Sequence, residues 1–308
     1  MRRIIGLVIV NIIVITVLAF ATKYFWTTAN LIVIADNMML EVVILSGYTL
    51  LLVGGYFDLS VDGIAAICGV VLGLLINNGT NWVIAIFAGL ALGVGIGIFN
   101  GVVVAKFKVN GLIATLCVWW LSIGFSLGMT KAISPYNFPD AFQVLAQTRI
   151  FGFRVLIIYA IIAVVILSVI LHWTRTGSHI YVSGDNHQSA ELMGIDTVKL
   201  GIILYTLVGV LASFVGIMMA SRLDAASPST VDGMTLRVIA AIVIGGGSLS
   251  GGKGNIIAGV LGLVLMHVLS NAVIQLGVSP YWQKAMLGSV LLIAVLSEKL
   301  HLKGVFKK

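Results

Sequence analysis

The residues of this sequence best suited to chemistry are the charged and amide side chains that interrupt long apolar runs. Asn37 and Glu41 lie one helical turn apart, and His267, Asn271 and Gln275 follow one another at intervals of four, so each set shares a helix face. A charged side chain in mid-membrane costs about 2.5–3.5 kcal/mol on insertion scales and therefore faces protein or water. These faces predict either a hydrophilic path for a polyol or hydrogen bonds between helices, and Glu41 with His267 would also suit a proton relay.

Aromatic and sulfur-containing side chains give weaker indications. Trp119 and its neighbour Trp120 can stack on a sugar ring, although packing or anchoring at the lipid interface is the simpler interpretation. Cys68 and Cys117 both fall inside apolar runs, where a thiol packs as a small hydrophobe. We therefore expect neither a disulfide nor a metal site.

A glycine-rich stretch at 245–254 looks at first like a nucleotide site. It reads Gly-Gly-Gly-Ser-Leu-Ser-Gly-Gly-Lys-Gly and nearly matches a phosphate-binding loop, but Gly254 stands where a hydroxyl residue would hold magnesium. No nucleotide-binding α/β domain can be drawn from this composition. We interpret Gly246, Gly251 and Gly252 as structural positions in a tight turn between helices.

A second turn, Asp58-Leu-Ser60-Val-Asp62, carries two carboxylates. As a catalytic acid pair they lack an accompanying nucleophile or base. A structural role is favoured instead, in which Asp58 or Ser60 caps the following helix.

The elements that position these residues follow from composition. Of the 308 residues, 60% are apolar and only 9% are charged, and the mean hydropathy is +1.13. Ordinary globular domains carry about 25% charged residues, and a membrane-spanning helix needs about 20 apolar ones. The sequence therefore predicts an all-α integral membrane protein of about ten transmembrane helices, at 4–22, 31–53, 61–77, 82–104, 111–130, 155–172, 200–220, 236–249, 255–276 and 282–298. The window at 236–249 is the shortest, and Gly89, Gly93, Gly97 and Gly101 share one face of the fourth span.

The distribution of basic residues sets the expected orientation. Placing both termini in the cytoplasm puts the larger share of the 18 lysines and arginines inside. The first apolar run resembles a signal peptide but is long for one, so we interpret it as the first span. The net charge is +7, but the basic residues form no stripe interleaved with aromatic residues. No nucleic-acid partner is therefore expected.

Two segments outside the predicted spans are long enough to have structure. Residues 132–154 suit a short helix-and-loop cap. Residues 174–199 are polar, and Asp185 or Ser183 is predicted to cap a short helix that ends at Gly194, with Ile195 packing back after the glycine.

Three stretches together resemble the permease subunits of bacterial ABC importers for ribose and related monosaccharides. Gly55-Tyr-Phe-Asp-Leu-Ser-Val-Asp62 is similar to the family's G-G-I-D-L-S-V-G. The run Tyr181-Val-Ser-Gly-Asp-Asn-His-Gln-Ser-Ala-Glu-Leu-Met-Gly-Ile195 is similar to A-V-G-G-N-x-x-A-A-x-x-x-G-I. The third is Ile239-Ala-Ala-Ile-Val-Ile-Gly-Gly-Gly-Ser-Leu-Ser-Gly-Gly-Lys-Gly254, similar to A-I-A-A-V-V-L-G-G-T-S-L-x-G-G-x-G.

The resemblance implies one transmembrane permease domain over 1–308 in the bacterial inner membrane, with 132–154 periplasmic. It implies a pore that carries a monosaccharide or related polyol, formed with a second permease copy or a paralogue. Two cytoplasmic ATPase subunits would bind the ATP and magnesium, so this chain would need no cofactor and would be no enzyme. The 174–199 loop would couple it to them, through Asp185, Asn186, Ala190, Glu191, Gly194 and Ile195.

The resemblance also implies a periplasmic sugar-binding protein that delivers the substrate. The arginines expected near the outer side are predicted to pair with acids on its rim: Arg149, Arg154, Arg222 and Arg237. A proton-coupled secondary transporter that uses Glu41 and His267 is the alternative function.

The sequence departs from the family's motifs at a few positions. Asp62 replaces a glycine, and the family's E-L-D-A-I-A-A reads Thr235-Leu-Arg-Val-Ile-Ala-Ala241, so Thr235 and Arg237 replace two acids. Glu41 stands where many relatives have a neutral residue. These changes leave the identity of the substrate open.

Overall fold

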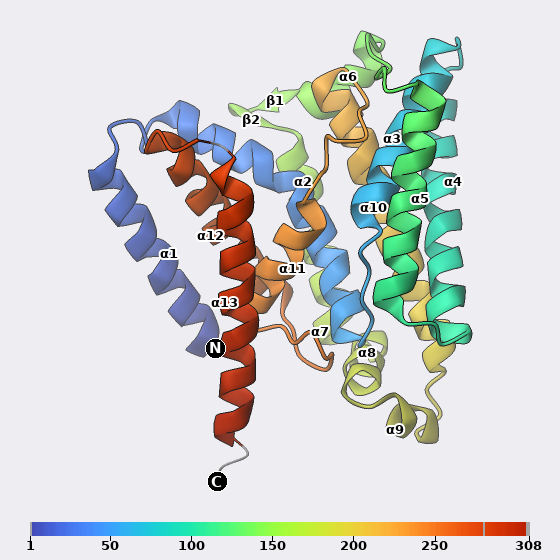
Figure 1. Cartoon of the computed structure of the whole chain (residues 1–308), viewed down its shortest axis with the longest axis vertical. Coiled ribbons are helices and arrows are strands. Elements are labelled where there is room, and N and C mark those ends of the chain that lie inside the picture. Colours follow the sequence, from blue (N-terminus) through green and yellow to red (C-terminus); the bar gives the residue numbers. More distant parts are fainter. Residues whose placement is uncertain (1, 280, 306–308) are drawn as a thin grey trace.

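The computed structural model describes residues 2–279 and 281–305, and in that part of the chain almost every element is a helix (Figure 1). The elements, which include one π-helical turn (η1), follow the chain in this order: α1 (Arg2–Ala21), α2 (Thr28–Val53), α3 (Val61–Asn77), α4 (Trp82–Gly101), η1 (Val102–Lys106), α5 (Gly111–Thr130), α6 (Asp140–Gln147), β1 (Arg149–Ile150), β2 (Phe153–Arg154), α7 (Leu156–Trp173), α8 (Arg175–Asp185), α9 (His187–Leu192), α10 (Thr197–Leu223), α11 (Met234–Ile244), α12 (Ile256–Gln275) and α13 (Trp282–Val305). The predicted all-α class is confirmed.

The helices differ in whether they are long enough to cross a bilayer. Within the described residues, 7 helices are long and apolar enough to do so, among them α2 and the 27-residue α10. By contrast, α11 has 11 residues, which at 1.5 Å per residue reach about 16 Å, half of a ~30 Å hydrocarbon core. The span predicted at 236–249 is thus a short helix followed by the glycine-rich turn, and the number of crossings stays a prediction.

The glycine face of α4 packs directly on α10. A Cβ added at Gly97 would lie 2.8 Å from the carbonyl oxygen of Tyr205, and one added at Gly101 would lie 2.6 Å from Cα of Ile202. Such close backbone approach holds membrane helices together, because lipid offers no hydrophobic driving force between them. The close contact predicted for this glycine stripe is confirmed.

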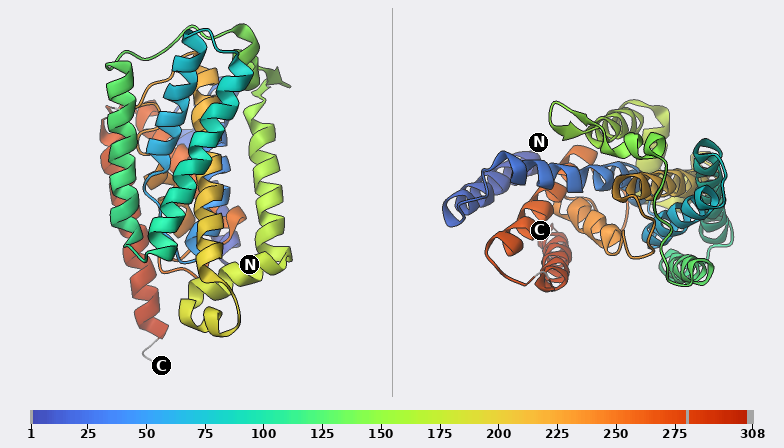
Figure 2. Two further views of the ribbon diagram at one scale, coloured as in Figure 1. Left: turned by 90° about the vertical axis from the view of Figure 1, so that its right-hand side faces the viewer. Right: turned by 90° about the horizontal axis from the view of Figure 1, so that it is seen from above.

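The two ends of the bundle carry different structures. The helix α6 and the β1–β2 hairpin, in which Arg149 pairs with Arg154, lie at one end, and α8 with α9 lies at the other (Figures 1 and 2). We call these the α6 end and the α9 end. The short helix expected within 132–154 is present as α6.

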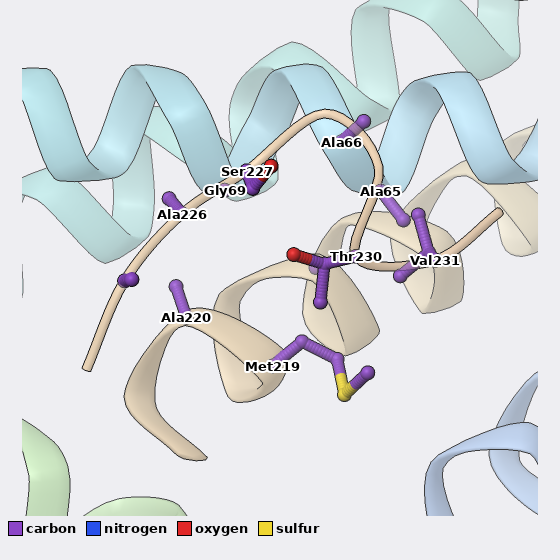
Figure 3. Close-up of a pocket in the computed structure, with 11 residues that line it drawn as sticks. Ala65, Ala66, Gly69, Met219, Ala220, Ala226, Ser227, Thr230 and Val231 are labelled. Atoms are coloured by element: carbon purple, nitrogen blue, oxygen red, sulfur yellow. The ribbon is translucent and has the colours of Figure 1, made fainter. Parts of the chain in front are cut away.

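Two non-helical segments enter the bundle from its opposite ends. Residues 54–60 rise from the end of α2 to α3, and residues 224–233 descend from α10 to α11 (Figure 1). Figure 3 shows the second segment lying between α3 and α10, where Ala65, Ala66 and Gly69 are small enough to admit it. The cavity left beside it is about 10 Å³, room for at most one water.

Candidate functional site

The predicted coupling loop folds into α8 and α9, with a cap one residue from the predicted one. The side chain of Asn186 accepts a hydrogen bond from Ser189 N at 3.0 Å and begins α9. The prediction of Asp185 or Ser183 as the cap was wrong. All three residue types favour a cap, and only the backbone, which is extended at Asn186, selects among them.

The predicted end of α9 is confirmed. Gly194 has φ +81°, a conformation that favours glycine, and Ile195 N donates to Ala190 O at 3.0 Å. Ala190 is buried, and the carboxylate of Glu191 accepts from the hydroxyl of Thr197 at 2.7 Å. The short helix is therefore tied to the start of α10.

The three stretches that carry the family resemblance meet in space at the α9 end. Gly55 and Gly251 both have positive φ, and Gly251 lies so close to Gly184 that an added Cβ would be 2.6 Å from its carbonyl oxygen. Gly252 N donates to Val53 O at 2.9 Å. We call this meeting of residues 53–55, 184–185 and 251–252 the glycine junction.

The glycine-rich turn that leads into this junction makes further contacts. Gly246 has φ +87°, and a Cβ added at Gly252 would lie 3.1 Å from Cα of Asp185. Tyr181, on α8, donates from its hydroxyl to Gly254 O at 2.8 Å. The glycine-rich turns contact residues 181–185 and seat α8 on the helix bundle.

Tyrosine side chains satisfy the backbone of the 54–60 segment. The phenols of Tyr48 and Tyr205 donate to the carbonyls of Asp58 and Phe57, each at 2.9 Å. Tyr56, from the segment itself, donates to Thr197 O at 2.9 Å. Irregular backbone inside a membrane protein requires such partners.

Asp58 and Ser60 form a turn, but they do not cap α3 as predicted. One Asp58 carboxylate oxygen accepts from Ser60 N at 2.7 Å and from the Ser60 hydroxyl at 2.5 Å, and α3 begins at Val61 without a side-chain cap. Asn100, on α4, donates to Ser60 Oγ at 2.8 Å. The carboxylate therefore fixes the turn between α2 and α3, and Ser60 anchors this turn to α4.

Three of the arginines predicted to dock a binding protein converge on the start of α2. Asp36 lies 3.2 Å from Arg154 and 3.9 Å from Arg149. Arg222 donates to the backbone oxygen of Asp36 at 3.0 Å and to the side chain of Asn37 at 2.6 Å. These side chains line a cavity of about 510 Å³ at the α6 end.

The fourth arginine lies apart from these three and pairs with another acid. Arg237 forms an ion pair with Glu41 at 2.8 Å, and His267 lies 3.0 Å from the other carboxylate oxygen. Arg237 belongs to the first turn of α11, which begins at Met234. Arg237 therefore links α11 to α2.

Four of the five candidate path residues come together in one cavity of about 280 Å³. Asn37, Glu41, His267 and Asn271 line it together with Arg222 and Arg237. Asn37 and Arg222 also line the outer cavity, so the two spaces adjoin. Asn271 in addition donates to Asn30 at 2.8 Å, so the hydrogen bonds between helices that we weighed for it are present.

Trp119 lies apart from these four, in a groove of about 360 Å³ between α5 and the 224–233 segment. Asp62, Trp120, Ser229 and Asp232 line the groove with it. A Cβ added at Gly63 would lie 2.9 Å from Trp119 Cδ1, so the glycine lets α5 approach α3 and brings the indole beside Asp62.

Asp62 was not among the predicted functional residues, because the sequence suggested only a place in a turn. In the structure its carboxylate accepts hydrogen bonds from the start of α11. Its carboxylate accepts from Gly233 N at 3.0 Å, from Thr235 N at 2.8 Å and from the Thr235 hydroxyl at 2.5 Å. Both Asp62 and Thr235 depart from the family's motifs, and they are in contact. Glu41 and Arg237 also depart from the family's pattern and are in contact. Two such departures in one sequence could therefore have been used to predict each contact.

No side chains in the described part of the chain form a group of three or more that could hold a metal ion. Cys68 and Cys117 are both free thiols, the first buried and the second exposed. Nothing in the arrangement of the described acids, histidines and cysteines provides an activated nucleophile.

Comparison with known proteins agrees with this picture of a transport subunit. The family model described as "Branched-chain amino acid transport system / permease component" matches residues 30–295. The ribose import permease protein of Escherichia coli (strain K12) is 36% identical over 292 residues, 92% of this chain and 90% of that protein. Its namesake from Bacillus subtilis (strain 168) is 32% identical over 289 residues, 93% of this chain and 90% of that protein.

A further relative is the autoinducer 2 import system permease protein of Escherichia coli (strain K12 / DH10B), 31% identical over 273 residues, 89% of this chain and 80% of that protein. No solved structure matches the chain. The family match covers most of the chain, and the matched proteins are permease subunits without catalytic activity of their own. The chain therefore belongs to this family of ABC-transporter permease components and is a multi-pass protein of the bacterial inner membrane.

Proposed function

We propose that this chain forms the pore of an ATP-driven importer that carries a monosaccharide or a related polyol. The relatives named for ribose and autoinducer 2 import support this class of substrate. The glycine junction carries the proposal, because it fixes the loop available to a cytoplasmic ATPase onto the end of α2 and onto the turn between α11 and α12.

In this proposal both termini are cytoplasmic, ten segments cross or enter the membrane, and the α9 end faces the cytoplasm. The α6 end, with 132–154, is then periplasmic. The positive-inside distribution of lysine and arginine supports this orientation, and so does the position of α6 and α9 at opposite ends (Figure 1).

The partners follow from the same proposal. Two ATPase subunits bind ATP and magnesium below α9, and a second permease copy or a paralogue completes the pore. A periplasmic sugar-binding protein docks at the α6 end, where Arg149 is half-exposed beside Asp36. Arg154 and Arg222 also contact Asp36 and add positive charge at this end. This charge would orient a binding protein whose rim carries acidic residues.

ATPase movement reaches the pore through contacts that leave little freedom. A push on α9 is passed to residues 184–185, which touch Gly55 and Gly251. One of these turns leads through 54–60 to α3, and the other connects α11 with α12. The helices α3 and α11 then move relative to the longer spans. This movement would open or close the space between the short helices and the longer spans.

The coupling assignment is tested by Gly194→Pro, with Gly79→Pro as the matched control. Gly194 and Gly79 have φ +81° and +85°, neither has another atom near its missing side chain, and they lie at opposite ends of the bundle. Proline cannot adopt positive φ, so each substitution disrupts one turn. We expect Gly194→Pro to abolish ATP-driven uptake in proteoliposomes while the chain still inserts, and Gly79→Pro to keep most of it.

Glu191→Lys should uncouple in the same way, because it breaks the bond to Thr197. Unchanged uptake in both α9 variants, or an equal loss in Gly79→Pro, would remove the coupling role from this loop.

A further inference from the structure

The groove beside α5 lies where irregular backbone reaches the middle of the membrane. The α11 helix ends at Ile244, next to the glycine-rich turn at the α9 end, and is about 16 Å long, so Gly233 at its start lies about halfway across a ~30 Å core. Non-helical backbone at this depth is stable only when it is buried in protein or lines a water-filled cavity. The 224–233 segment does both, since Ala226 and Val231 are buried while Ser229 and Asp232 line the groove.

The groove combines the two kinds of group that recognise sugars. The indoles of Trp119 and Trp120, with ring centroids 5.1 Å apart, offer apolar faces for the C–H side of a sugar ring. Asp62, Asp232 and Ser229 offer oxygen atoms that accept hydrogen bonds from hydroxyl groups. A volume of about 360 Å³ falls within the ~300–1,000 Å³ range of small-molecule sites.

Asp62 is held in place yet keeps acceptor capacity. Gly233 and Thr235 supply three hydrogen bonds, and a carboxylate has about four lone-pair sites. Among the described residues Asp62 takes part in none of the ion pairs, and only 5% of it is exposed. A negative charge at this depth is costly, and a polyol in the groove would contribute one further hydroxyl donor to Asp62.

One ion pair lies at the edge of the groove. Lys284, near the start of α13, contacts Asp232 at 2.9 Å, and both side chains are exposed. This contact joins α13 to the 224–233 segment, which forms one wall of the groove.

We propose that the groove formed by Asp62, Trp119, Trp120, Ser229 and Asp232 is a polyol-binding site on the wall of the pore, where the sugar rests between its delivery and its release. The proposal rests on the proposed import function and adds a place where the permease itself contacts the substrate.

The test uses the complete importer in proteoliposomes, with its ATPase and binding protein, and measures sugar transported per ATP hydrolysed. The probes are D-ribose, D-xylose, D-glucose and D-galactose. Trp120 is 63% exposed and Trp26, outside the groove, is 60% exposed, so Trp120→Leu and Trp26→Leu are a matched pair. We expect Trp120→Leu and Asp62→Asn to lower the ratio about tenfold, the loss that follows from one missing interaction of 1.4 kcal/mol, while Trp26→Leu keeps the wild-type ratio.

A labelling experiment reports on the groove without relying on turnover. In a Cys117→Ser chain, Ser229→Cys places a thiol on the wall, and Cys68 is buried, so it does not compete. We expect a cationic thiol reagent to modify residue 229 about tenfold more slowly when the transported sugar is present.

The outcomes separate the two proposals. Wild-type uptake with unchanged ratios in Trp120→Leu and Asp62→Asn, or an equal loss in Trp26→Leu, overturns the groove and leaves the import function standing. Failure of the wild-type importer to move any of the four sugars with ATP overturns both.

Discussion

The cavity around Glu41 and the groove around Asp62 solve the same problem in different ways. Each buries a carboxylate inside the helix bundle, and each carboxylate joins α11 to another helix. Glu41 is neutralised by Arg237 at 2.8 Å and contacts His267 at 3.0 Å, whereas neutral backbone and hydroxyl donors hold Asp62. Arg237 pairs directly with Glu41, which suits a structural link, whereas Asp62 forms no direct ion pair and keeps acceptor capacity for a ligand.

The largest expected effect is on stability, at the paired site. Arg237→Leu leaves Glu41 buried beside His267 without its main counter-ion, and breaking a buried ion pair costs about 3–5 kcal/mol. Adding Glu41→Gln removes the unpaired charge but keeps an acceptor for His267, so the double variant should recover most of the loss. Thermal unfolding of the purified chain in detergent measures both, and a double variant no more stable than Arg237→Leu would contradict the role of the pair.

A smaller effect is expected at the unpaired site. Asp62→Ala removes the acceptor for Gly233 and Thr235, and leaving buried donors unsatisfied costs about 1–3 kcal/mol. Asp232→Ala, on the exposed side of the same groove, is the control and should stay within ~0.5 kcal/mol of the wild type. A loss at Asp62 as large as that of Arg237→Leu would mean that the two sites do not differ as described.

The smallest expected effect lies at the amide contact between α2 and α12. Asn30 and Asn271 bond to each other in both directions, at 2.8 and 3.2 Å, and hydrogen bonds between membrane helices contribute about 0.6 kcal/mol on average. Asn271→Leu should therefore lower stability by about that amount. Combining it with Asn30→Leu should cost less than the sum of the two single changes, and strict additivity would show that the two amides do not interact.

Regular features of the chain were predictable because they depend on neighbouring residues. The apolar windows, the glycine face of α4 and the end of α9 at Gly194 all follow from local periodicity or backbone preference. The cap of α9 was misplaced because Ser183, Asp185 and Asn186 have similar preferences and stand within four positions.

The contacts that define the two sites depend on positions far apart in the sequence. Glu41 and Arg237 are separated by 196 positions, and Asp62 and Thr235 by 173. Hydropathy suggested that Arg237 lies near the outer surface, because it did not show that α11 begins halfway through the bundle. The 224–233 segment is the element that moves Arg237 inward, and its path depends on packing against α3 and α10.

The glycine junction also has a consequence for timing. A methyl group at Gly184 would collide with the carbonyl oxygen of Val53, and one at Gly251 would press on Gly55, so the three backbones touch without intervening side chains. Because these backbones are in direct contact, a displacement of one would move the others immediately. A displacement of α8 would reach the ends of α2 and α11 within the same step, so events at the nucleotide and in the pore would be simultaneous and would not follow one another with a delay.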